Sequence, residues 1–195
     1  MVILAFVALV AGVLWGLFGS TQTILELVAQ NSHWILYLLM FSVGISVGLH
    51  KGILEKIKQY HIKIFIIPFG VILGSILGGW LTALILAMPI QQGVAVASGM
   101  GWYSLSGVVI AEMYGATMGS IAFLSNLLRE MISFFCIPWI ARNLNYYAAI
   151  APAGATSEDT TLPIIMKYTN QETVVLSVFN GMLCSAVVPI LIGVY

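Results

Sequence analysis

The sequence predicts an all-α integral membrane protein of about seven transmembrane segments, two of them discontinuous helices. The first observation is composition, because 61% of the 195 residues are hydrophobic and only 7% are charged, whereas soluble domains carry roughly 25% charged residues. The second is that apolar residues gather in runs long enough to cross a bilayer. The third is that two of these runs hold glycines, prolines and polar residues in their middle. We treat residues 1–195 as one transmembrane domain.

Seven runs have the length of a spanning helix, which needs about 20 mostly apolar residues with a range of about 17 to 25. The predicted spans are 2–18, 32–50, 62–87, 93–113, 115–141, 146–166 and 172–194. The first three and the last are continuous apolar runs. The fourth and the sixth contain features that ordinary spans avoid, and they are the predicted discontinuous helices.

Basic residues set the expected orientation. Four of the seven Lys and Arg residues lie between Lys51 and Lys63, and loops rich in these residues stay in the cytoplasm. Counting crossings from that loop puts the N-terminus in the cytoplasm and the C-terminus outside. If the fourth segment re-enters instead of crossing, every later element changes side.

The third span carries Gly70, Gly74 and Gly78 at four-residue spacing. Small residues at that interval line one stripe of a helix and let a neighbouring backbone approach closely. We interpret this stripe as a packing surface and not as a functional one.

The fourth segment is predicted to break at its glycines. Gly99, Gly101 and Gly107 alternate with serines that include Ser104. Irregular backbone at membrane depth is tolerated only where protein buries it or where it lines a water-filled cavity. The alternative is a continuous, close-packed helix rich in glycine.

The sixth segment has a stronger signal for a break. Pro152 and Pro163 lack the backbone donor that a continuous helix needs. Between them stand the consecutive polar residues Thr156, Ser157, Glu158, Asp159, Thr160 and Thr161. Six polar side chains in a row cannot all face away from lipid on a regular helix, whereas a broken helix lining a cavity accommodates them. The alternative is a solvent-exposed loop between two short helices.

The fifth span contains the pair Arg129-Glu130 inside an apolar run. Helical spacing places Asn126, Glu130 and Ser133 on one face and Arg129 on the adjacent stripe. Neighbouring positions do not face each other, so Arg129 and Glu130 each need another partner. Ionisable groups at membrane depth usually line an ion or substrate path. A structural network of ion pairs that holds the bundle together is the alternative.

Partners for these two side chains follow from their charges. Arg129 is expected to pair with Glu158, with Asp159, or with a substrate carboxylate. Glu130 is a candidate site for a cation or a proton.

Several function classes are not supported by the sequence. It offers no paired nucleophile and base, no metal-type spacing of His and Cys, and no phosphate-binding loop, so we predict neither an enzyme nor a cofactor or metal site. A formal net charge of zero gives no reason to expect nucleic acid. Cys136 and Cys184 lie in apolar runs and are interpreted as small buried residues. A secondary transporter is the expected class.

Four blocks of the chain, at residues 97–107, 123–130, 154–163 and 188–192, closely resemble the LysO lysine exporter family. The resemblance covers nearly the whole chain. It implies an exporter of L-lysine and toxic lysine analogues in the bacterial or archaeal inner membrane, driven by the proton gradient. It also implies an inverted-repeat transporter fold in which two discontinuous helices cross, and it identifies Glu130 as the acidic residue required for export.

Combined with the resemblance, the residues suggest a mechanism of exchange. An exported ammonium group and an incoming proton share Glu130, while Asp159 or Glu158 holds the second ammonium group. Arg129, or the half-helix ends near Gly101 and Thr156, receives the substrate carboxylate. The full predicted set of substrate- and proton-binding residues is Gly101, Ser104, Asn126, Arg129, Glu130, Thr156, Ser157, Glu158 and Asp159.

The chain departs from the family pattern in length. Full-length members carry further residues on the N-terminal side, including a second acidic site, and this chain opens on Met1 after them. The expectation is one product of a split exporter, whose missing helices come from a small separate membrane protein. Assembly with further copies of the chain stays open.

Other functions remain as alternatives. A transporter of the same architecture would move another amino acid or an organic anion, with Arg129 as its main substrate contact. A non-transporting subunit would leave the path to its partner.

Overall fold

The computed structural model describes residues 64–195 and eight single positions before them (7, 10, 11, 14, 34, 38, 41 and 45), each helical and exposed. By its contacts the chain divides into two compact units, Met1–Phe41 and Ser42–Tyr195. The architecture below is that of residues 64–195, within the second unit. The predicted spans 2–18 and 32–50 and the basic segment Lys51–Lys63 lie outside the described residues.

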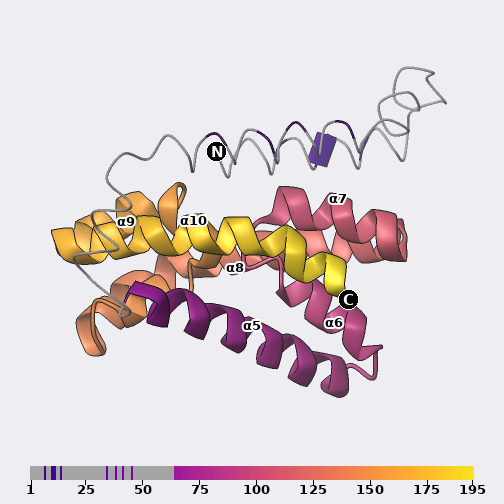
Figure 1. Cartoon of the computed structure of the whole chain (residues 1–195), viewed down its shortest axis with the longest axis horizontal. Coiled ribbons are helices and arrows are strands. Elements are labelled where there is room, and N and C mark those ends of the chain that lie inside the picture. The colour runs from indigo at the N-terminus through magenta and orange to yellow at the C-terminus, as the bar shows by residue number, and fades with distance from the viewer. Residues whose placement is uncertain are drawn as a thin grey trace. The chain divides into compact units, whose positions relative to one another are not determined.

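Residues 64–195 form only helices and their connections (Figure 1). The elements are α5 (Ile66–Ile85), α6 (Ile90–Ala97), α7 (Tyr103–Tyr114), α8 (Ala116–Asn143), η2 (Ala148–Ile150), η3 (Gly154–Glu158), α9 (Leu162–Tyr168) and α10 (Gln171–Val194). Local signals mark several ends. Gly115, with φ of 91°, separates α7 from α8, and the side chain of Asn170 caps α10 by accepting from the backbone nitrogen of Thr173 at 2.9 Å.

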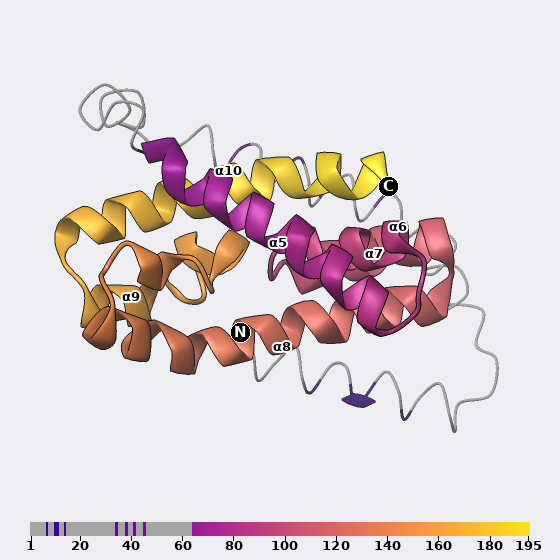
Figure 2. The ribbon, with the colours of Figure 1, turned by 90° about the horizontal axis from the view of Figure 1, so that it is seen from below.

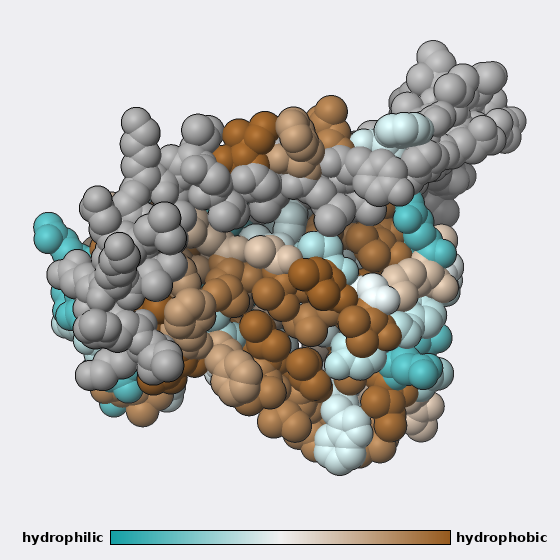
Figure 3. Space-filling model, in the orientation of Figure 1, coloured by the Kyte–Doolittle hydropathy of each residue, from teal (hydrophilic) through white to brown (hydrophobic). Residues whose placement is uncertain are grey.

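Three helices in this part of the chain, α5, α8 and α10, are long and apolar enough to cross a membrane. Large apolar side chains are exposed along α5 and α8, including Phe69, Leu77, Leu128 and Phe135. Figure 3 shows hydrophobic residues covering the face that α5 and α10 present, with hydrophilic residues toward the two ends of these helices. Such a surface is stable against lipid but not against water. The chain is therefore a multi-pass membrane protein.

The long helices define two ends of the bundle (Figure 2). At the Ile66 end, α5 and α10 begin and α8 ends; at the Ile85 end, α5 and α10 end and α8 begins. Residues from three elements, Ile64, Ile150 and Phe179, pack together at the first end. At the second end the hydroxyl of Tyr114 donates to the backbone oxygen of Tyr195.

The segment predicted to cross as 93–113 instead enters from the Ile85 end and returns to it. Helix α6 runs back along α5 and packs closely against it. The two backbones approach so closely that a Cβ on Gly79 would lie 2.7 Å from the carbonyl oxygen of Gly93. Helix α7 runs antiparallel to α8 and packs closely against it. A Cβ on Gly119 would lie 2.7 Å from the carbonyl oxygen of Gly107. Residues 98–102 between them form the break, so the alternative of a continuous glycine-rich helix is wrong.

The segment predicted as 146–166 behaves in the same way at the opposite end. Ala149, Ala153 and Ile165 pack against Ile137 and Ala141 near the end of α8. The chain then enters α10 from the Ile66 end. Five crossings were expected after residue 62, and the structure has three helices of spanning length there, so the count of seven spans is not confirmed.

The glycine stripe of α5, predicted to be a packing surface, meets no neighbour within residues 64–195. A Cβ added to Gly70, Gly74 or Gly78 would meet no described atom within 4 Å. The close approach is made by Gly79, on the neighbouring stripe, against α6. The spacing of the glycines identified a stripe without side chains, but it could not show which stripe of α5 packs against another helix.

Candidate functional site

The two breaks touch each other in the middle of the bundle. The backbone nitrogen of Ala155, in η3, donates to the carbonyl oxygen of Met100 at 2.9 Å. Met100 and Gly101 have positive φ angles of 47° and 96°, and Gly154 has one of 58°. A side chain on Gly154 would collide with the carbonyl oxygen of Met100. Glycine is therefore required at Gly154 both by its backbone conformation and by the close approach of the two breaks.

Asn126 on α8 supplies the hydrogen bonds that the first break lacks. Its amide nitrogen donates to the carbonyl oxygens of Val96 at 2.9 Å and Ala122 at 3.0 Å. Its amide oxygen accepts from the backbone nitrogen of Gly101 at 2.8 Å. The side chain is buried, with an exposed fraction of 2%. All three of these hydrogen bonds are thus made with backbone groups.

Hydrogen bonds from helix α10 hold the second break, the irregular segment around η3, in place. The hydroxyl of Ser157 lies 2.8 Å from the carbonyl oxygen of Ser177, whose own hydroxyl donates to the carbonyl oxygen of Ser157 at 2.6 Å. The amide nitrogen of Asn180 donates to the carbonyl oxygen of Gly154 and to the hydroxyl of Ser157, both at 2.9 Å. Residues 154–157 are buried, so the alternative of a solvent-exposed loop is wrong for them.

Glu130 is fully buried on α8. Within the described part of the chain its carboxylate makes no hydrogen bond of standard geometry, and the side chain of Thr160, just after η3, is placed for a looser one. Asp159, which precedes Thr160, also acts on the charge of Glu130. The Tyr103 hydroxyl, at the start of α7, interacts with the charges of both Glu130 and Asp159. Its ring packs edge-on against Phe123 of α8, with centroids 5.3 Å apart. These four residues, Tyr103, Glu130, Asp159 and Thr160, form what we call the acidic site.

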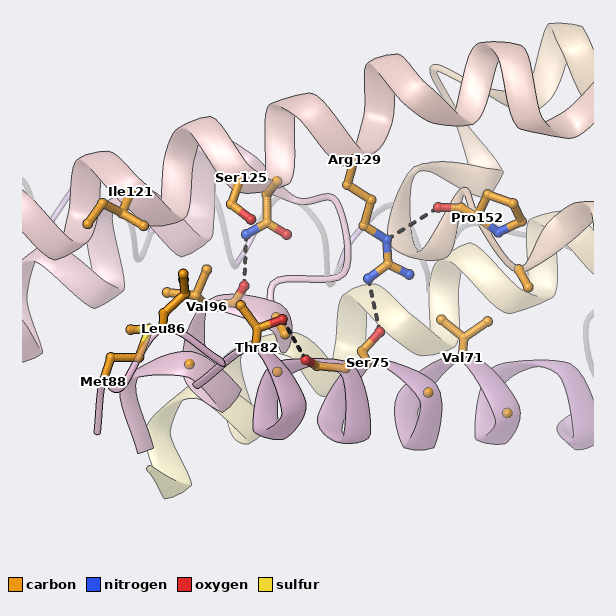
Figure 4. A pocket seen from close by; sticks show the side chains of 18 of the residues that line it. Val71, Ser75, Thr82, Leu86, Met88, Val96, Ile121, Ser125, Arg129 and Pro152 are labelled. Atoms are coloured by element: carbon orange, nitrogen blue, oxygen red, sulfur yellow. Dashed lines mark hydrogen bonds between the residues drawn. The ribbon is translucent and has the colours of Figure 1, made fainter. Parts of the chain in front are cut away.

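Arg129 points across a chamber toward α5 (Figure 4). Its Nη1 donates to the hydroxyl of Ser75 at 2.9 Å and its Nε to the carbonyl oxygen of Pro152 at 3.3 Å. The chamber has a volume of about 630 Å³ and lies between α5, α6 and α8. The expected ion pair of Arg129 with Glu158 or Asp159 is not formed within residues 64–195. Glu158 instead accepts from the hydroxyl of Ser185 at 3.0 Å.

The structure divides the predicted site residues into three groups. Glu130 and Asp159 share the acidic site, and Arg129 lies in the chamber. Those engaged in holding the breaks are Gly101, Asn126, Thr156, Ser157 and Glu158. The Thr156 hydroxyl, for example, donates to the carbonyl oxygen of Ala153 at 2.9 Å. Ser104 is exposed on the first turn of α7.

The residues that sequence reasoning missed include Ser75, Tyr103, Thr160 and Asn180. Ser75 and Asn180 are polar residues with apolar neighbours on both sides in the helices α5 and α10, and that was the available signal. Tyr103 carried no signal, because an aromatic residue near glycines is also typical of a packing position.

Comparison with known proteins was made over the whole chain. Residues 6–195 match the family model described as lysine exporter LysO. A protein of Escherichia coli K12 named "Lysine exporter LysO" is 36% identical over 176 residues, which cover 90% of this chain and 58% of that protein. A Haemophilus influenzae protein named "Putative lysine exporter" is 39% identical over 161 residues, covering 82% of this chain and 80% of that protein.

The chain thus spans somewhat more than half the length of the E. coli relative. No solved structure matches it. The family match extends through both breaks, the acidic site and the chamber. The chain belongs to the lysine exporter LysO family.

Proposed function

We propose that this chain exports L-lysine, and toxic analogues of lysine, across the inner membrane in exchange for protons. The observation that carries the proposal is Glu130, a fully buried carboxylate that makes no hydrogen bond of standard geometry to the described residues. A buried carboxylate left without partners is costly unless a cation or a proton occupies it. Its position beside the crossing of two breaks is typical of transporter sites.

Exchange follows from the chemistry of one carboxylate. Ionised Glu130 attracts an ammonium group, whereas protonated Glu130 is neutral and releases it. Lysine and the proton therefore displace each other, so that lysine leaves as a proton enters. Asp159, which is exposed beside Glu130, is suited to the second ammonium group. Glu158 is less suited, because its carboxylate already accepts from Ser185.

A second candidate function is the transport of another amino acid or an organic anion. It is favoured by Arg129, which is the only charged residue among the described residues that line the chamber. In this case Arg129 would be the main substrate contact. Competition of labelled lysine with arginine and with organic acids separates the two functions.

The proposed orientation rests on the two re-entrant segments. Arg142 and Lys167 both lie at the Ile66 end, beside the same ring of Tyr168, 5.2 Å and 5.4 Å from its centroid. In sequence, Lys51–Lys63 directly precedes this end of α5. Because cytoplasmic loops are enriched in Lys and Arg, the Ile66 end faces the cytoplasm and the C-terminus lies outside. The small partner subunit, the cytoplasmic N-terminus and assembly with further copies stay predictions.

The test is lysine efflux from cells that lack their own exporter and are loaded with a lysine-containing dipeptide. The chain is expressed alone and together with the small membrane protein encoded beside it. In the active combination, Glu130→Gln is expected to abolish efflux while the protein remains in the membrane. Glu112→Gln, at an exposed position on α7, is the matched control and is expected to keep efflux. Normal efflux by Glu130→Gln would refute the exchange mechanism, and no efflux from any combination would refute lysine export.

A further inference from the structure

We propose that the chamber beside Arg129 binds the carboxylate of the amino-acid substrate, and that Ser75 is the positioning residue that aims Arg129 at it. This inference rests on the proposed function and names the part of the substrate that the chamber recognises. It assigns a role to α5, which the sequence suggested only as a packing helix.

The hydrogen bonds of Arg129 leave a binding surface inside the chamber. Ser75 and Pro152 occupy its Nη1 and Nε atoms, at 2.9 Å and 3.3 Å. Its Nη2 makes no hydrogen bond to residues 64–195, and the Ser75 hydroxyl, which accepts from Arg129, keeps its own proton available within the same part of the chain. Arg129 of α8 and Ser75 of α5 therefore each keep a donor, and the two side chains are in direct contact through Nη1. A planar guanidinium with an adjacent donor suits the two oxygens of a carboxylate.

The charge of the chamber also favours the binding of a carboxylate. The described residues that line it include Arg129 but no Asp or Glu. A cation at membrane depth without a counter-charge is costly, and a carboxylate in the chamber removes that cost. An amine without a carboxylate meets only a like charge there. The chamber is thus suited to select amino acids over amines.

The other donors expected for a substrate carboxylate are already in use. The backbone nitrogen of Gly101 donates to Asn126 at 2.8 Å, and that of Ala155 donates to Met100 at 2.9 Å. The nitrogen of Thr156 donates to the carbonyl oxygen of Ala153 at 3.1 Å. The half-helix ends therefore hold the two breaks in place, and Arg129 with Ser75 is left for the carboxylate.

The glycines of α5 explain why the chamber is open. Gly70, Gly74 and Gly78 form the wall around Ser75, and a Cβ on any of them would meet no described atom within 4 Å. The volume of about 630 Å³ exceeds the needs of an amino acid as long as lysine. The described helices therefore leave room for a substrate beside Arg129.

The experiment is competition binding with labelled lysine on membranes that contain the full chain with any partner it needs. The competitors are lysine, its amide lysinamide, and cadaverine, which lacks the carboxylate altogether. Variants Ser75→Ala and Ser75→Thr are compared with Ser120→Ala, whose exposed hydroxyl lies outside the chamber and donates to the carbonyl oxygen of Ala116 in its own helix, 2.9 Å away.

We expect cadaverine and lysinamide to compete at least about 10-fold less well than lysine, because each loses charge-assisted hydrogen bonds to Arg129. Ser75→Ala should weaken lysine binding about 3- to 10-fold and leave cadaverine unchanged, so that the preference shrinks. Ser75→Thr should restore the preference, and Ser120→Ala should retain it. A structural role of Ser75 alone would weaken all three competitors equally.

Three results would overturn the inference, and they are distinguishable. Equal competition by lysine, lysinamide and cadaverine would show that the carboxylate is not recognised, while lysine export itself would stand. Absence of lysine binding in the unmodified protein would remove the proposed function and this inference with it. A Ser75→Ala variant that keeps the full preference for lysine would show that Ser75 does not position Arg129.

Discussion

The amide oxygen of Asn126 accepts a hydrogen bond from the backbone nitrogen of Gly101, 2.8 Å away. The same side chain donates to Val96, on the other side of the break. Asn126 of α8 thus links the end of α6 to Gly101, just before α7 begins. The first break is therefore an ordered structure whose backbone groups are hydrogen-bonded by a neighbouring helix.

Replacing Asn126 with Ala should destabilise the fold. The change leaves buried backbone groups of Val96 and Gly101 without partners, at a cost of about 1–3 kcal/mol for each group. Thermal unfolding in detergent measures the loss. Ser120→Ala is the control, because its exposed hydroxyl bonds only the carbonyl oxygen of Ala116 in its own helix. Equal stability of the two variants would contradict the bracing role of Asn126.

The neighbouring glycines Gly78 and Gly79 should respond differently to alanine. A Cβ on Gly79 would lie 2.7 Å from the carbonyl oxygen of Gly93 and 2.8 Å from the Cβ of Ala97, whereas one on Gly78 would meet open space. Gly79→Ala is expected to cost about 1–3 kcal/mol through overpacking, and Gly78→Ala to be tolerated. Measuring the free energy of unfolding of both variants tests this expectation. Loss of stability in Gly78→Ala alone would show that the other stripe packs.

Single cysteines should report the two re-entrant segments. With Cys136 and Cys184 replaced, Arg142→Cys and Lys167→Cys should react with a membrane-impermeant thiol reagent from the same side. Gln91→Cys, at the Ile85 end, should react from the opposite side. If segments 93–113 and 146–166 crossed the membrane, Arg142→Cys and Lys167→Cys would instead be labelled from opposite sides.

Tyr103→Phe should weaken transport without unfolding the protein. The variant keeps the ring that packs against Phe123 but loses the hydroxyl that interacts with Glu130 and Asp159. Loss of this polar group beside two carboxyl groups should lower lysine efflux, by about 10-fold if the hydroxyl contributes about 1.4 kcal/mol to the transport step. Tyr146→Phe, at an exposed position, should behave as the unmodified protein. An unchanged rate for Tyr103→Phe would remove Tyr103 from the acidic site.

Part of this structure could be predicted from the sequence, because the costs involved are local. Apolar runs identify membrane helices, and Gly99, Gly101 and Pro152 disfavour continuous ones whatever surrounds them. Helical periodicity placed Asn126, Glu130 and Ser133 on one buried face of α8, as the structure has them. It also placed Arg129 on another stripe.

The tertiary structure alone decided where these elements meet. A run of about 20 apolar residues has the length to cross a membrane, but only the packing of Gly79 on Gly93 and of Gly107 on Gly119 shows that the chain between α5 and α8 turns back. In the same way, Arg129 was expected to pair with a carboxylate and is bound instead by Ser75, 54 positions away in the chain. Local patterns report the cost of placing a residue in lipid or in a helix. They carry no information about which distant group stands within hydrogen-bond distance, because that is set by the packing of whole helices.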